Sequence, residues 1–141
     1  MLKKDNRITQ NKEFLRMFKT VRPVHTEHLA LRCTQRIIDK QETITRRITN
    51  SNFNNTKNLK PVTCNLKPRF GFVVSNKIDK RAARRNAIKR RIRAVIEENL
   101  SQIPDGIDLV VQIKKPFEYP YNYAKIRQEV YIGLHKIGAL K

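Results

Sequence analysis

The segment formed by residues 81–96 reads RAARRNAIKRRIRAVI, and the expected fold is built around it. On a helix, where successive side chains are about 100° apart, its large apolar residues form one stripe: Ile88, Ile92, Val95 and Ile96. The pattern predicts a helix from about residue 80 to residue 100 that packs on a sheet through this stripe. Asp79 is the expected N-cap, because its carboxylate can accept a bond from a free backbone N–H and suits the positive end of the helix dipole.

Basic side chains crowd the flank of this stripe. Seven of the thirteen residues from 81 to 93 are Lys or Arg. Four side chains share one flank of the stripe: Asn86, Lys89, Arg90 and Arg93. Arg85 lies at the border between this flank and the stripe. Glu97 and Glu98 come only at the far end, so the cations repel one another. A phosphate backbone would reverse that repulsion, and arginine donors suit folded RNA. The flank is therefore interpreted as an RNA-binding surface, with a solvated charged face as the alternative.

The segments next to this helix have the patterns of strands and of a second helix. Phe70, Phe72 and Val74 alternate and share one face of an expected strand. Residues 107–113 form a nearly continuous apolar run, which is typical of a buried strand. Apolar side chains then recur at three- and four-residue steps and predict an amphipathic C-terminal helix: Tyr123, Ile126, Val130, Leu134 and Ile137.

The N-terminal part predicts one helix followed by strands. On a helix over residues 8–19, Phe18 shares a face with either Phe14 or Leu15. Residues 21–34 alternate loosely and predict one or two strands. The resulting order, α-β-β-β-α-β-α, predicts an α+β fold: a single-domain α/β sandwich whose small sheet is packed by helices.

One domain over residues 1–141 fits the length of the chain. Within it we expect a long flexible insert at about 36–68, where asparagines crowd and large apolar residues are few. Two forms of the insert are open: a mobile loop, or an extended hairpin with residues 43–45 as its strand-like piece.

The charge of the chain points to a polyanionic partner. Lys and Arg number 31 against 12 Asp and Glu, a formal net charge of +19. A domain so charged repels itself unless a polyanion neutralises it, and nucleic acid is the first candidate. An anionic membrane surface is the rival, but the chain shows neither an amphipathic helix with a large apolar face and aromatic anchors nor a lipidation signal.

The remaining chemistry-bearing residues are scattered. Cys33 and Cys64 lack CxxC spacing and are expected as reduced thiols, one in a strand and one in a loop. The three histidines show no metal-ligand pattern with acids or cysteines, so no metal site is expected in the protein. The start has no apolar run of a secretory signal, and no stretch approaches the ~20 apolar residues of a membrane helix. These observations predict a cytoplasmic protein.

The basic helix resembles a known family. Arg85-Asn86, followed by Lys89-Arg90 and Arg93, resembles the signature helix of the bacterial ribonuclease P protein family. Residues 71–78 are similar to that family's strand leading into the helix, and Asn6-Arg7, Phe14 and Phe18 fall at its N-terminal spacing. The resemblance covers about residues 4–34 and 69–139, in the family's order of elements, and implies a fold like domain 2 of ribosomal protein S5.

The resemblance implies a function and a set of binding residues. Proteins of this family hold a catalytic RNA that removes the 5′ leader from precursor tRNA by hydrolysis of one phosphodiester bond. The RNA and its bound Mg²⁺ carry the chemistry, so no catalytic residue is expected in the protein. The implied RNA-subunit-binding residues are Arg81, Arg84, Arg85, Asn86, Lys89, Arg90 and Arg93. The implied leader-binding residues are Phe14, Phe18, Arg7 and Lys77.

The chain departs from the family pattern at three positions. Ala87 stands where the signature has a further arginine, although Arg91 supplies a cation on another side of the helix. Arg32 stands at a site in one wall of the leader cleft that is often aromatic. Asn76 stands where a lysine is common. By periodicity alone, Phe14 and Phe18 are ordinary core residues, and only the resemblance assigns them to a cleft.

Three other functions share part of this sequence pattern. A ribosomal-type structural RNA-binding protein shares the charge and the basic helix but needs no leader cleft. A DNA-binding protein is not expected, because strands flank the helix where a helix-turn-helix motif has a second short helix. A protein-only nuclease is disfavoured by the scattered acids.

Overall fold

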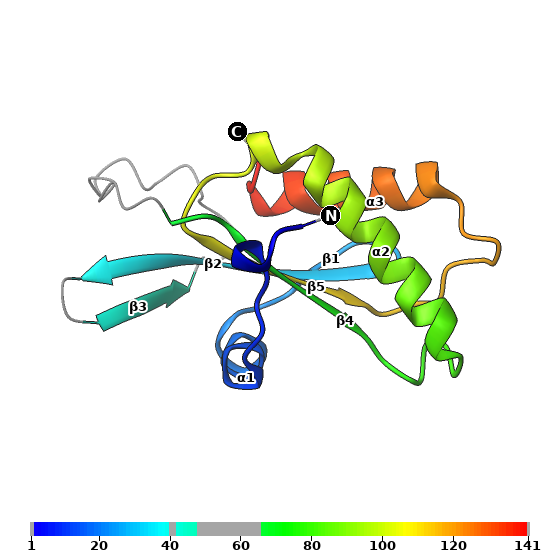
Figure 1. The fold of residues 1–141 in the computed structure, drawn as a ribbon, viewed down its shortest axis with the longest axis horizontal. Helices are drawn as coiled ribbons and strands as arrows, with labels where there is room; N and C mark the ends of the chain where they lie inside the picture. Colours follow the sequence, from blue (N-terminus) through cyan, green and yellow to red (C-terminus); the bar gives the residue numbers. More distant parts are fainter. Residues whose placement is uncertain (1, 40–41, 48–65, 141) are drawn as a thin grey trace.

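The computed structural model describes residues 2–39, 42–47 and 66–140. In chain order the elements are η1 (Lys4–Asn6), α1 (Asn11–Thr20), β1 (Val24–His25), β2 (Leu29–Asp39), β3 (Glu42–Arg47), β4 (Arg69–Val74), α2 (Ala82–Glu98), η3 (Leu100–Gln102), β5 (Ile107–Ile113) and α3 (Tyr123–Ile137). Helices α2 and α3 lie on one side of the sheet and α1 lies on the other (Figure 1). The α+β sandwich is therefore confirmed.

The sheet has the strand order β1-β2-β5-β4, and β3 pairs with β2. Strand β4 runs parallel to β5, whereas β2 is antiparallel to its three neighbours. Gly71, Val110 and Arg32 form one row across β4, β5 and β2. This row lies on the face that α1 covers, and it positions part of the candidate site.

The larger core lies between the sheet and the helices α2 and α3. The stripe of α2 is buried as predicted, with Val95 and Ile96 fully enclosed. It packs against apolar side chains of three strands, among them Leu31, Phe70 and Leu109. The predicted face of α3 is buried along with it, except for Tyr123, which is half-buried. Burial of this stripe, at roughly 25 cal/mol per Å² of apolar surface, is what holds the basic helix at a fixed angle on the sheet.

A smaller core lies under α1. Ile8, Met17 and Val110 are buried there, and Phe14 and Phe18 pack against them. Of the two predicted pairings on this helix, the one of Phe14 with Phe18 is confirmed, because Leu15 is 59% exposed. Strand β5 is thus covered on both faces, which explains its nearly continuous apolar run.

Two local predictions need correction or restriction. Asp79 is not the N-cap of α2: its Oδ1 accepts a bond from the backbone N–H of Arg81 (2.8 Å), and the helix begins only at Ala82. Residues 36–39 and 42–47 belong to the β2–β3 hairpin, so the extended form of the insert describes them. The rest of the expected insert, including Cys64, lies outside the described residues except for its last three positions.

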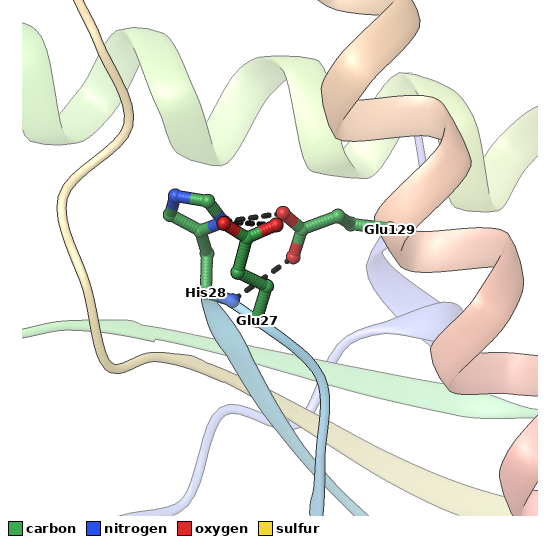
Figure 2. Close-up of side chains that lie close together, drawn as sticks. All are labelled: Glu27, His28 and Glu129. Carbon is green, nitrogen blue, oxygen red and sulfur yellow. Dashed lines mark hydrogen bonds and ion pairs between the residues drawn. The ribbon is translucent and has the colours of Figure 1, made fainter.

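A buried pair fastens α3 to the turn between β1 and β2. The carboxylate of Glu129 accepts a hydrogen bond from Nδ1 of His28, and its Oε2 accepts two more, from the His28 backbone N–H (3.0 Å) and from Oγ1 of Thr26 (3.2 Å). Figure 2 shows Glu129 reaching from α3 toward the histidine. The imidazole also stacks on Phe117, with 4.5 Å between ring centres.

None of the helices in these described ranges is both long and apolar enough to cross a membrane.

Candidate RNA interface

Helix α2 carries cations on both flanks of its buried stripe. At about 100° per residue, Lys89 and Arg93 fall on one flank and Arg84 and Arg91 fall on the other. The contacts agree with this division: Arg93 lies over Phe72 of β4, whereas Arg84 and Arg91 lie over tyrosines of the segment between β5 and α3. The helix therefore presents positive charge toward two different surfaces, only one of which was expected from the sequence.

The flank toward β4 brings three arginines together. The guanidinium carbon of Arg93 lies 5.4 Å from the ring centre of Phe72. Burial lowers the pKa of Arg93, and the positive charges of Arg7 and Arg90 lower it further. The Nε atoms of Arg7 and Arg93 are buried without a hydrogen-bond partner in the described part of the chain. An anion bound at this point would offset the repulsion among these charges.

The other members of the predicted RNA-subunit set are placed differently from one another. Arg81, Asn86 and Arg90 are exposed, and Lys89 is half-buried. Arg85 instead turns back along the chain, where its Nη1 donates to the backbone oxygens of Asp79 (2.8 Å) and Lys80 (2.9 Å). In this arrangement Arg85 holds the turn that precedes α2.

Arg91, one helical turn after Ala87, reaches back to the position where the family signature has an arginine. Nη1 of Arg91 lies 3.5 Å from the backbone oxygen of Ala87. The guanidinium of Arg91 therefore extends back over the turn that contains Ala87, so this part of the helix surface carries a cation despite the alanine.

On the other face of the sheet, α1 holds its two phenylalanines over the row of Gly71, Val110 and Arg32. Phe14 lies against Gly71, where an added Cβ would meet the ring carbon Cζ at 2.6 Å. The guanidinium carbon of Arg32 lies 4.4 Å from the ring centre of Phe18, and its Nη1 donates to Oε1 of Gln112 (3.0 Å). Arg32 is only 8% exposed, and burial lowers its pKa.

The structure shows how Arg32 is accommodated at a position that is often aromatic in the family. The buried guanidinium of Arg32 stacks on Phe18 at the position where the resemblance expects an aromatic ring. It places a flat, positively charged group against the phenylalanine, a cation–π arrangement.

An ionic cluster fixes the start of α1 on this face. Asp108, which is 5% exposed, accepts two bonds from Arg69 (3.0 and 2.8 Å), and Arg69 also pairs with Glu13 of α1 (2.8 Å). Nε of Arg36 lies 3.0 Å from the same Asp108 carboxylate. The hydrogen bond with Asp108 is the main cause that raises the pKa of Arg69. The cluster holds α1 at the angle that places its phenylalanines over the sheet.

The predicted leader-binding residues are not all brought together. Arg7 pairs with the outer edge of β4, since the next residue, Ile8, donates its backbone N–H to the oxygen of Phe70 (2.9 Å). Its side chain belongs with Arg93 on the α2 side. Lys77 is exposed in the turn after β4, at the other end of that strand from Arg7. Only Phe14 and Phe18 lie together in the smaller core.

Two groups were missed by the sequence reasoning. Tyr119 and Tyr121 lie beneath Arg84 and Arg91 of α2. In the sequence, these tyrosines are marked only by their place in a proline-containing segment after β5, which does not predict a contact with α2. Glu27, His28 and Glu129 offer ligand atoms within 4.8 Å of one another, which would suit a metal ion. No spacing pattern could reveal this group, because Glu129 lies 101 residues from His28. In the structure the Glu129 carboxylate is already engaged by three donors, as described above.

Comparisons with known proteins identify related sequences. The profile of the family Ribonuclease P matches residues 2–138. The ribonuclease P protein component of Nitrosomonas eutropha is 40% identical over 78 residues, which cover 55% of this chain and 62% of that protein. That of a Cyanothece species is 29% identical over 130 residues, covering 92% of this chain and 90% of that protein. The chain thus spans somewhat less than two thirds of the first of these relatives.

Solved structures share the fold. The RNase P protein of Staphylococcus aureus superimposes with a TM-score of 0.67 at 20% identity, covering 96% of this chain and 98% of that one. The RNase P protein of Thermotoga maritima gives a TM-score of 0.63 at 22% identity, covering 89% and 94%.

Proposed function

Because the chain belongs to the ribonuclease P protein family, we propose that it is the protein subunit of a ribonuclease P ribonucleoprotein. In this role it binds a catalytic RNA and the 5′ leader of precursor tRNA, and it assists removal of that leader in the cytoplasm. Its partners are ribonuclease P RNA and precursor tRNA.

The observation that carries the proposal is the group of arginines on the β4 flank of α2. Burial lowers the pKa of Arg93, and the nearby charges of Arg7 and Arg90 lower it further. The Nε atoms of Arg7 and Arg93 are buried without a hydrogen-bond partner among the described residues. A cluster of like charges of this kind is stabilised when a binding partner supplies the negative charge. Phosphate oxygens of RNA supply that charge and accept bidentate bonds from guanidinium groups.

The surface of α1 supports the second half of the role. Phe14 and Phe18 are each partly exposed and sit over a cationic sheet face that contains Arg32. Aromatic rings beside cations bind single-stranded nucleotides without sequence preference, with stacking of roughly 1–3 kcal/mol per base. This tolerance suits a leader, because leaders differ between tRNAs.

The chemistry of cleavage is assigned to the RNA partner. When Mg²⁺ is bound by that RNA, it supplies an activated water and stabilises the leaving oxygen. On the protein's side, the acid nearest the start of α2, Asp79, is engaged by the backbone of Arg81 and lies 4.0 Å from Arg84. In the proposed function, the basic and aromatic side chains of the protein bind and orient RNA.

A binding experiment at several salt concentrations tests the proposal. Arg90→Gln removes an exposed charge from the flank, and Lys136→Gln removes an exposed charge from α3 as the matched control. For ribonuclease P RNA, Arg90→Gln should weaken binding and reduce the slope of log K against log salt by about 1. The control should leave both unchanged. Equal effects of the two variants would mean that only net charge matters and would overturn the assigned surface.

A further inference from the structure

The second flank of α2 forms a ladder of arginines and tyrosines. The guanidinium carbon of Arg84 lies 4.3 Å from the ring centre of Tyr119, and that of Arg91 lies 5.4 Å from the ring centre of Tyr121. The two tyrosines meet edge to face, with 5.5 Å between ring centres. Arg84 and Arg91 are seven residues apart, so they stand two turns apart on one side of the helix. We call these four side chains the Arg–Tyr ladder.

Tyr119 is the open end of the Arg–Tyr ladder. It is 63% exposed even with Arg84 over its ring, whereas Tyr121 is half-buried against the larger core. An aromatic side chain as exposed as Tyr119 contributes little to the hydrophobic core. Arg84 lies over the ring of Tyr119, and Tyr121 meets that ring in an edge-to-face contact, so the ring is already oriented before any partner binds, which lowers the entropy cost of stacking on it.

The charge around the Arg–Tyr ladder selects an anionic partner. Lys80 and Arg81 are exposed beside Arg84 at the start of α2. The acids in this region are Asp79, which lies 4.0 Å from Arg84, and Glu118, which precedes Tyr119. Cations therefore outnumber acids around an exposed aromatic ring. This is the combination of stacking platform and positive charge with which proteins bind unpaired nucleotides.

We propose that the Arg–Tyr ladder is a base-stacking site that binds an unpaired nucleotide of the ribonuclease P RNA through the ring of Tyr119. The base stacks on Tyr119, while Arg84 and the exposed Lys80 and Arg81 neutralise its phosphates. The inference rests on the proposed function, and it adds a contact on the second flank of α2 to the one assigned to the β4 flank.

The position of the Arg–Tyr ladder favours ribonuclease P RNA over precursor tRNA. The ladder belongs to α2, whose exposed arginines are assigned to the RNA subunit. The phenylalanines assigned to the leader belong to α1, on the opposite side of the sheet (Figure 1). A leader seated on α1 leaves the ladder free, whereas an RNA that covers α2 lies beside it.

The test compares three variants in binding assays with two separate RNAs, ribonuclease P RNA and precursor tRNA. Tyr119→Ala removes the ring, and Tyr119→Phe keeps it. Tyr131→Ala removes a tyrosine that is 48% exposed on α3, away from the ladder. Tyr119→Ala should weaken binding of ribonuclease P RNA by about 5- to 100-fold. The salt slope should stay unchanged, since no charge is lost, and Tyr119→Phe and Tyr131→Ala should bind as the parent does.

Several results would overturn the proposal. They are wild-type affinity of Tyr119→Ala for ribonuclease P RNA, a loss confined to precursor tRNA, or an equal loss in Tyr119→Phe. Failure of the parent protein itself to bind ribonuclease P RNA would instead overturn the proposed function. A benzophenone amino acid at position 119 gives a second readout: it should crosslink to an unpaired nucleotide of ribonuclease P RNA, and a crosslink only within a base-paired helix would contradict the stacking.

Discussion

Gly71 sets how closely α1 approaches the sheet. With no side chain at this position, the ring of Phe14 lies directly on β4, and an added Cβ would also come within 3.3 Å of Val110. Any larger residue must push the ring outward, so the geometry of the proposed leader surface depends on a residue that touches no RNA.

Gly71→Ala should therefore disturb leader binding selectively. Overpacking should lower the free energy of unfolding by about 1–3 kcal/mol and reduce the preference for precursor tRNA with a leader over the same tRNA without one. Gly133→Ala is the matched control, because its Cβ would meet Leu31 at 2.6 Å on the other side of the sheet. The control should cost stability but keep the preference for the leader. An unchanged preference in Gly71→Ala would argue against Phe14 as a leader contact.

Cys33 makes a residue-scale prediction about pH. Burial, together with the negative charge of Asp108, raises the pKa of its thiol to about 12, against about 8.5 in an unfolded chain. Between these values the unfolded state holds fewer protons than the native state, so stability should fall as pH rises through this window.

The measurement uses a Cys64→Ser background, in which Cys33 is the remaining thiol. At pH 9, iodoacetamide should modify it much more slowly in the native protein than in urea. Cys33→Ala should lose this part of the pH dependence of unfolding. Rapid alkylation without denaturant would show that the thiol is accessible, contrary to its burial.

At the scale of elements, periodicity predicted most of what the structure contains. The stripe of α2, the alternation of Phe70 and Phe72, and the apolar run of β5 each record which face of an element is buried. The boundaries were less predictable. Asp79 has the chemistry of an N-cap, but the turn after β4 places it where its carboxylate binds the backbone of Arg81 before the helix begins.

The candidate site was predictable where it depends on one helix and unpredictable where it depends on tertiary contacts. The flank with Arg90 and Arg93 follows from the angular positions of its residues. The partners of Arg84 and Arg32 do not, because Tyr119 and Phe18 come from distant segments. For the same reason Arg85, a cation in the signature, could not be foreseen as the residue that holds the turn before α2.

The docking of α3 depends on Glu129. Removal of this carboxylate in Glu129→Ala leaves the buried backbone N–H and ring nitrogen of His28 without their acceptor. The free energy of unfolding should fall by about 1–3 kcal/mol, as measured by urea denaturation. Glu27→Ala, which removes a 70% exposed side chain 3.9 Å from the same ring, should have little effect. Similar losses in the two variants would contradict the assigned role of Glu129.

At the scale of the whole molecule, the sheet separates two cationic surfaces. Helix α2 with both of its basic flanks lies on one side, and α1 lies on the other (Figure 1). Phe18 of α1 lies over Arg32, and Phe14 lies against Gly71. In the proposed function, these two surfaces bind two RNA segments at once. This is what a protein needs if it is to hold a catalytic RNA and the leader of its substrate in one complex.

The most direct test of this account is cleavage of a 5′-labelled precursor tRNA at low Mg²⁺. The reactions contain the purified chain alone, ribonuclease P RNA alone, or both. Only the mixture should release an intact leader. Phe14→Ala should weaken this effect through the substrate, and Arg90→Gln should weaken it through the RNA. If the protein binds RNA tightly but adds nothing to cleavage, it is a structural RNA-binding protein of the ribosomal type. If the chain alone cleaves, the assignment of catalysis to the RNA is wrong.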